Sequence, residues 1–153
     1  MFMLKFLFNY WETTKHRWWV FYYSLKFSLK LLRRAIVHDL SKYSSKEAPF
    51  FADNTPKLKK TTYGSKEYKK FLENLKPALD HHYKINSHHP ECFDLGFRDM
   101  SGLDRIEMII DWLAATKRHG DGDIDRSVKI NKKRFTYSNN DEIWLRKIAE
   151  ELR

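Results

Sequence analysis

Histidines gather in one short segment of this chain. Four of the seven histidines lie within residues 81–89, in the run HHYKINSHH. On a helix, His82, Asn86 and His89 would be spaced by four and then three residues, which predicts that they share one face. Imidazole is the commonest metal ligand in proteins and exchanges protons near neutral pH. The segment therefore predicts a metal site or, if these side chains only pack, a group of structural histidines.

The dipeptide His38-Asp39 is a second candidate, because both side chains can reach one ion where the backbone turns at a helix end. It follows an apolar run and precedes Lys42, whose ammonium can meet a phosphate oxygen as a point charge. His16, in an aromatic segment, is by itself more typical of a packed histidine with one hydrogen bond.

A third candidate is an acidic stripe in the apolar segment 104–115. Asp104, Glu107 and Asp111 are spaced as one face of a helix, while the apolar residues nearly encircle it and predict burial. A buried carboxylate is costly unless it is paired or hydrogen-bonded. Either salt bridges to lysine or arginine, or ligation of a metal, would offset the cost of burying these carboxylates.

Helical periodicity dominates the elements that must position these residues. The N-terminal apolar run is too short to span a membrane and lacks a cleavage site for a signal peptide, so we expect a buried first helix or strap. We expect an all-α fold of five to seven helices, forming one compact domain over residues 1–153. The expected helices are 10–37 (one helix, or two with a break near Lys26), 46–52, 65–87 with a kink or break at Pro77, 103–117 and 140–152, with a polar loop at 54–64.

Composition indicates the compartment of the protein but does not identify its ligand. The net charge of +9 indicates either a solvated basic face or a surface that attracts nucleotides, nucleic acids or phosphorylated metabolites. The single cysteine, Cys92, cannot form an internal disulfide, so we expect a reducing cytoplasm. The sequence has no Gly-rich phosphate loop, no Gly-x-Ser-x-Gly motif and no cysteine pair for a zinc finger.

The order of these candidates along the chain resembles that of the HD-domain superfamily of metal-dependent phosphohydrolases. That order is His16, His38-Asp39, the histidine segment and Asp111. Members are all-helical and hold a metal with a first His, a His-Asp pair and a distant Asp, with extra histidines where a second metal binds. A closer resemblance is to an uncharacterised family of phage and bacterial proteins. Its blocks HDLSK(F/Y)S..E, HH...N.HH and EM..DW..A match residues 38–47, 81–89 and 107–115, although the lysine-rich residues 54–70 match nothing in it.

The resemblance to the superfamily implies a role for each matching residue. The implied ligands of the principal metal are His16, His38, Asp39 and Asp111, with His82 as an intervening ligand and His88 and His89 for a second metal or the phosphate. The catalytic candidates are Asp39 and Lys42, the latter as a phosphate contact. Glu47 and Glu107 have no counterpart in the superfamily; from its residue type we expect Glu47, a third catalytic candidate, to accept a proton and Glu107 to orient a ligand. Mixed nitrogen and oxygen ligation suits one or two ions of Mn, Fe, Co, Ni or Zn.

The expected function is therefore hydrolysis of a nucleotide or another small phosphorylated compound. One alternative is an HD-type di-iron oxygenase, because the extra histidines are compatible with two irons. Another is a non-catalytic phage protein that binds nucleic acid or a component of a defence system, in the host cytoplasm, which the +9 charge suits. No membrane span is expected, and the sequence predicts no oligomeric state.

Overall fold

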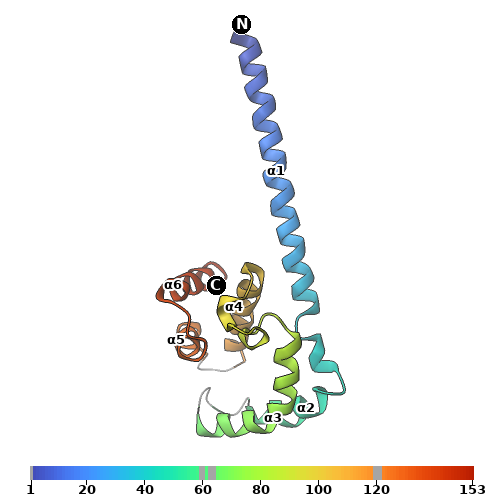
Figure 1. Cartoon of the computed structure of the whole chain (residues 1–153), viewed down its shortest axis with the longest axis vertical. Coiled ribbons are helices and arrows are strands. Elements are labelled where there is room, and N and C mark those ends of the chain that lie inside the picture. The colour runs from blue at the N-terminus through green and yellow to red at the C-terminus, as the bar shows by residue number, and fades with distance from the viewer. Residues whose placement is uncertain (1, 59–60, 62–64, 119–121) are drawn as a thin grey trace. The chain divides into compact units, whose positions relative to one another are not determined.

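The computed structural model describes residues 2–58, 61, 65–118 and 122–153 (Figure 1). Its described residues form six α-helices and no strand, which confirms the all-α expectation. Three short 3-10 helices lie between them. The elements are α1 (Phe2–Val37), η1 (Leu40–Tyr43), α2 (Ala48–Leu58), α3 (Lys66–Ile85), η2 (Pro90–Cys92), η3 (Gly96–Arg98), α4 (Gly102–Thr116), α5 (Ile124–Phe135) and α6 (Asn139–Glu151).

The chain divides into two compact units, residues 1–38 and residues 39–153, where the sequence had suggested no boundary. The first unit is the single helix α1, which runs without the break allowed for near Lys26. This stretch is helical although the hydroxyl of Ser28 donates to the carbonyl of Ser24 at 2.9 Å, a bond that competes with the helical backbone bonds. The large apolar side chains of α1 are exposed, contrary to the buried first helix expected. No helix in the described part of the chain is long and apolar enough to cross a membrane.

The second unit contains two groups of helices, and within each group the helices pack against one another. Helix α2 packs along α3, while α4, α5 and α6 pack together around one apolar core. Serine caps set where several helices begin, because Ser101 and Ser138 each form a capping box with the carboxylate three residues on. The core residues are Phe97, Met100, Met108, Ile109, Ile124, Val128, Tyr137, Leu145 and Ala149.

The helices differ from the expected ones in four places. Helix α1 begins at Phe2, eight residues before the expected start. Helix α2 begins next to Pro49, which a first turn tolerates, and extends into the predicted loop as far as Leu58. Residues 59–60 and 62–64 of that loop lie outside the described residues. Helix α3 continues through Pro77. Helix α5 was not predicted, because its sequence is mostly polar and basic, although Asp123 caps its first turn and Val128 is fully buried.

Candidate metal centre

Four side chains of the types that can ligate a metal converge in the second unit. Asp39 precedes η1, His82 lies in the last turn of α3, and His88 and His89 lie in the turn that follows α3. Each offers one ligand atom, and these four atoms all lie within 4.8 Å of one another. Asp39 has a left-handed backbone with φ 58°, which aspartate tolerates better than most residues, so the chain turns sharply there.

The ligand atoms of this cluster face a common point. Oδ1 of Asp39 lies 3.1 Å from Nε2 of His82 and 3.4 Å from Nε2 of His88. The Nε2 atoms of His82 and His89 are 3.0 Å apart. Three imidazole nitrogens and one carboxylate oxygen form a donor set that suits a divalent transition metal.

The surroundings of His89 and Asp39 favour the protonation states that can bind a metal. Desolvation, together with the nearby His88 and His82, lowers the pKa of His89 to about 3, so its ring is neutral at pH 7. Burial alone would raise the pKa of Asp39, but the adjacent imidazoles of His82 and His88 and the ammonium of Lys42 outweigh it and hold that pKa below its ordinary value. Neutral imidazole and ionised carboxylate are the forms that ligate metals.

Glu47 sits behind the cluster and orients two histidines. Its side chain is fully buried, with Oε2 3.0 Å from Nδ1 of His82 and Oε1 2.7 Å from Nδ1 of His81. The hydroxyl of Ser41 donates to Oε2 of Glu47 at 3.0 Å and lies 2.9 Å from Nδ1 of His82. A carboxylate that accepts the Nδ1 proton leaves the Nε2 lone pair of His82 for a metal. Glu47 is thus placed as a support for His82, whereas the sequence suggested a proton acceptor.

Glu107 makes the equivalent contact on another ligand. Its Oε1 lies 3.3 Å from Nδ1 of His88, which fits the orienting role expected for it. Both Glu107 and Asp104 are buried on α4. Asp104 has a structural function, because it closes the capping box with Ser101 and accepts a 2.6 Å hydrogen bond from Ser87. Asp111 is half-buried, with a carboxylate oxygen within 4.8 Å of a ring nitrogen of His88.

The route by which His89 reaches the cluster differs from the predicted one. Helix α3 ends at Ile85 and Asn86 is its C-cap, so His89 is not on the same helical face as His82. Instead, the amide of His89 donates to the carbonyl of Asn86 at 3.1 Å in a turn that folds the chain back. The side chain of Asn86 donates to the carbonyl of His82 at 2.8 Å and to Ser41 at 2.9 Å. Ser41, a residue that the sequence did not predict to have a role, therefore joins η1 to the end of α3.

Two of the predicted metal ligands belong to the first unit. His38 is its last residue and is bonded to Asp39 through the backbone. His16 lies exposed in the middle of α1, about 32 Å from Val37 along the axis at about 1.5 Å per residue. The expectation that His16 and His38 hold the same ion is therefore not met, because a continuous helix separates them.

The comparisons with known proteins identify a family. The pattern of one protein family, a family of unknown function, matches residues 5–153. The chain belongs to the DUF5662 family. No curated protein and no solved structure matches this DUF5662 chain. The match includes all four residues of the Asp39/His82/His88/His89 cluster, together with Glu47 and Glu107.

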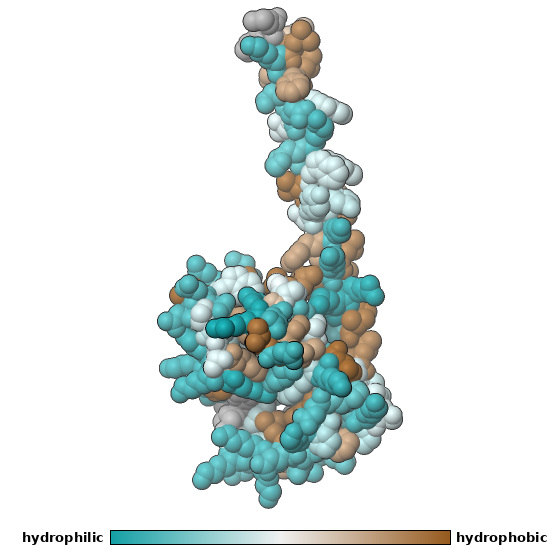
Figure 2. Space-filling model, in the orientation of Figure 1, coloured by the Kyte–Doolittle hydropathy of each residue, from teal (hydrophilic) through white to brown (hydrophobic). Residues whose placement is uncertain are grey.

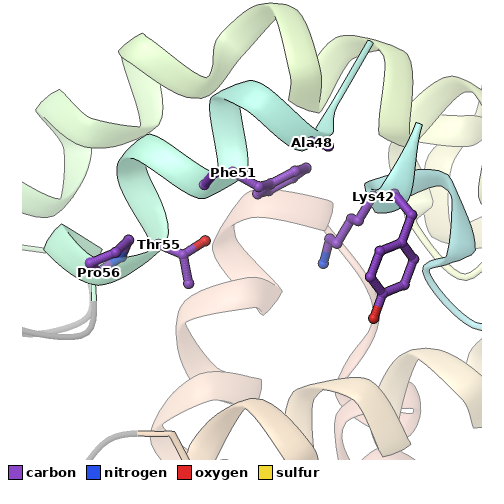
Figure 3. A pocket seen from close by; sticks show the side chains of 7 residues that line it. Lys42, Ala48, Phe51, Thr55 and Pro56 are labelled. Atoms are coloured by element: carbon purple, nitrogen blue, oxygen red, sulfur yellow. The ribbon is translucent and has the colours of Figure 1, made fainter. Parts of the chain in front are cut away.

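A pocket of about 610 Å³ in the DUF5662 protein adjoins the cluster through Lys42 (Figure 3). We call it the α2 pocket; its lining residues are Lys42, Tyr43, Ala48, Phe51, Ala52, Thr55 and Pro56. Nζ of Lys42 lies 2.5 Å from Oδ2 of Asp39 and 5.2 Å from the ring centre of Phe51. One ammonium group therefore contacts both a candidate metal ligand, Asp39, and an aromatic wall of the pocket.

Proposed function

We propose that this DUF5662 protein is a metal-dependent phosphohydrolase that acts on a nucleotide or another small phosphorylated compound. The observation that carries the proposal is the cluster of Asp39, His82, His88 and His89, two of them buried and two half-buried, with an ammonium group beside it. The donor set favours Mn, Fe, Co, Ni or Zn. The resemblance of its blocks to HD-domain phosphohydrolases supports the same reaction class, with a ligand set that here does not draw on His16.

Each residue has a separate task in this proposal. A bound divalent ion would supply Lewis-acid activation of a phosphoryl oxygen and a water of lowered pKa. Asp39 and the three histidines hold the ion, while Glu47 and Glu107 fix the orientation of His82 and His88. Lys42 offsets the charge that develops on the phosphoryl oxygens as the bond to the leaving group breaks.

The α2 pocket is suited to the organic part of the substrate. Its volume of about 610 Å³ is within the range of about 300–1,000 Å³ typical of small-molecule sites. Phe51 and Tyr43 offer aromatic surface, and Thr55 offers a hydroxyl. Because Lys42 lies between this wall and Asp39, a substrate with a phosphate at Lys42 can place an aromatic ring, such as a nucleobase, against Phe51.

The test combines metal analysis with a substrate screen. The purified protein is analysed for bound metal and then assayed with Mn, Fe, Co, Ni or Zn on nucleotides, sugar phosphates and p-nitrophenyl phosphate. We expect about one ion or more per chain and metal-dependent release of phosphate, with both lost in His82→Ala. His16→Ala is the control and should keep the metal. A protein that binds no metal, or binds metal and hydrolyses nothing in the panel, contradicts the proposal. Oxygen uptake by an iron form would favour the di-iron oxygenase instead.

A further inference from the structure

Helix α1 carries an apolar stripe that the candidate metal centre does not use. Residues 4, 7, 11, 14, 18, 21, 25, 29, 32 and 36 follow one another at intervals of three or four, so they form one line along the helix. Thr14 is the one polar residue among them, and the other nine are exposed, from 45% for Leu25 to 72% for Leu4. We call this line the α1 stripe. Figure 2 shows apolar and near-neutral residues running along α1 beside hydrophilic ones.

Most of the net positive charge of the protein lies on the same helix, because this helix has few acidic residues. Residues 1–38 contain seven lysines and arginines and one acidic residue, Glu12, which accounts for +6 of the net charge of +9. Glu12 is itself paired with Lys15 at 2.5 Å. Lys15, Lys26 and Arg33 are spaced by about three and then two helical turns, so they follow one edge of the stripe.

Aromatic residues are also enriched on α1. Eleven of the 24 aromatic residues of the chain lie within it, including Trp11, Trp18 and Trp19. The rings of Trp19 and Tyr23 stack at 5.9 Å between centres, one helical turn apart. Tryptophan and tyrosine are enriched at the interface between bilayer and water, where an apolar ring and a polar group are both satisfied.

These features favour one kind of partner over the others. Two copies of α1 side by side would place cations beside cations, with only Glu12 of each copy to balance them. A nucleic acid would satisfy the cations and leave the stripe in water. An anionic bilayer surface satisfies both, because the stripe enters the boundary of the acyl chains while the lysines and arginines meet the headgroups.

We propose that α1 binds the surface of an anionic membrane and lies in its plane, with the α1 stripe inserted. At about 1.5 Å per residue the 36-residue helix extends about 54 Å along the surface. The proposal is independent of the metal centre, because it uses only residues of the first unit.

The test measures binding of the full chain to vesicles by co-sedimentation. Vesicles of phosphatidylcholine with phosphatidylserine are compared with pure phosphatidylcholine, and we expect affinity about 100-fold lower for the pure vesicles. Leu25→Asn with Leu29→Asn, on the stripe, should weaken binding by about tenfold or more. Val20→Asn with Phe27→Asn is the matched control, since both residues are as exposed but lie on the opposite side of α1, and it should change binding by less than about threefold. Circular dichroism confirms that all variants stay helical.

Three results would overturn the proposal. The first is binding to anionic vesicles that the stripe variant does not weaken, because cations alone would then explain it. The second is absence of vesicle binding together with a dimer in sedimentation-velocity runs that the stripe variant converts to a monomer, which would assign the stripe to a second copy. The third is a monomer that does not bind vesicles.

Discussion

Replacing Glu47 by glutamine tests whether the buried carboxylate orients His82. The change keeps the size of the side chain but replaces one acceptor oxygen by an NH₂ donor. In the protein, the two oxygens of Glu47 face Nδ1 of His81 at 2.7 Å, Nδ1 of His82 at 3.0 Å and the Ser41 hydroxyl at 3.0 Å. A donor placed opposite Nδ1 of His82 favours the tautomer with the proton on Nε2, which is the nitrogen that faces the cluster.

The expected loss follows from that tautomer. Removing a group that supports a metal-bound histidine typically lowers metal affinity by about 10- to 100-fold, which corresponds to about 1.4–2.7 kcal/mol. Isothermal titration of the metal-free Glu47→Gln protein with Zn²⁺ should show this loss, with a fold that circular dichroism finds unchanged. Glu73→Gln makes the same chemical change at an exposed position of α3 and is the control. If Glu47→Gln bound Zn²⁺ as tightly as the unaltered protein, the orienting role would be refuted, whatever its effect on thermal stability.

Three further predictions concern single residues. Lys42→Ala should keep the bound metal and the fold while lowering kcat by about 10²–10³, measured by phosphate release on whichever substrate the screen identifies; a normal kcat would show that Lys42 serves only its ion pair with Asp39. His89 has a pKa of about 3 in the folded protein and 6.5 in the unfolded chain, so lowering the pH from 7.5 to 5.5 protonates this residue only in the unfolded state. The free energy of unfolding of the metal-free protein should therefore fall by about 1.4 kcal/mol more than that of His89→Gln. Urea denaturation at the two pH values measures that difference, and equal losses in both proteins would contradict it. Ser101→Ala removes the cap of α4 and should lower the free energy of unfolding by about 1 kcal/mol in the same assay, whereas Ser45→Ala, in a turn outside the capping boxes, should change it by less than about 0.5 kcal/mol.

Local pattern was enough to predict most helices of this protein. The boundaries of α4 and α6 lie within two residues of the predicted ones, because each has an apolar face and a serine, aspartate or asparagine at its start. Helix α5 was not predicted, because helix prediction from sequence depends on the periodic spacing of apolar residues. Only the packing of Ile124 and Val128 into the core shows which face of α5 is buried. The continuity of α1 through Ser24 and Ser28 was likewise left open by the sequence.

The sequence by itself determined which residue types were available for chemistry and that they would be carried on helices. It concentrated four histidines in residues 81–89 and set a carboxylate at Asp39, where the chain could turn. Only the tertiary structure decided which of these meet: Glu47 contacts His82 from 35 residues away, and His16 is kept far from His38 by an unbroken helix. Periodicity describes neighbours within about one or two turns, whereas contacts between elements depend on how the buried faces pack and where the turns lie. That is why the metal-binding residue types could be read from the sequence, while the set that converges and the carboxylates that orient it could not.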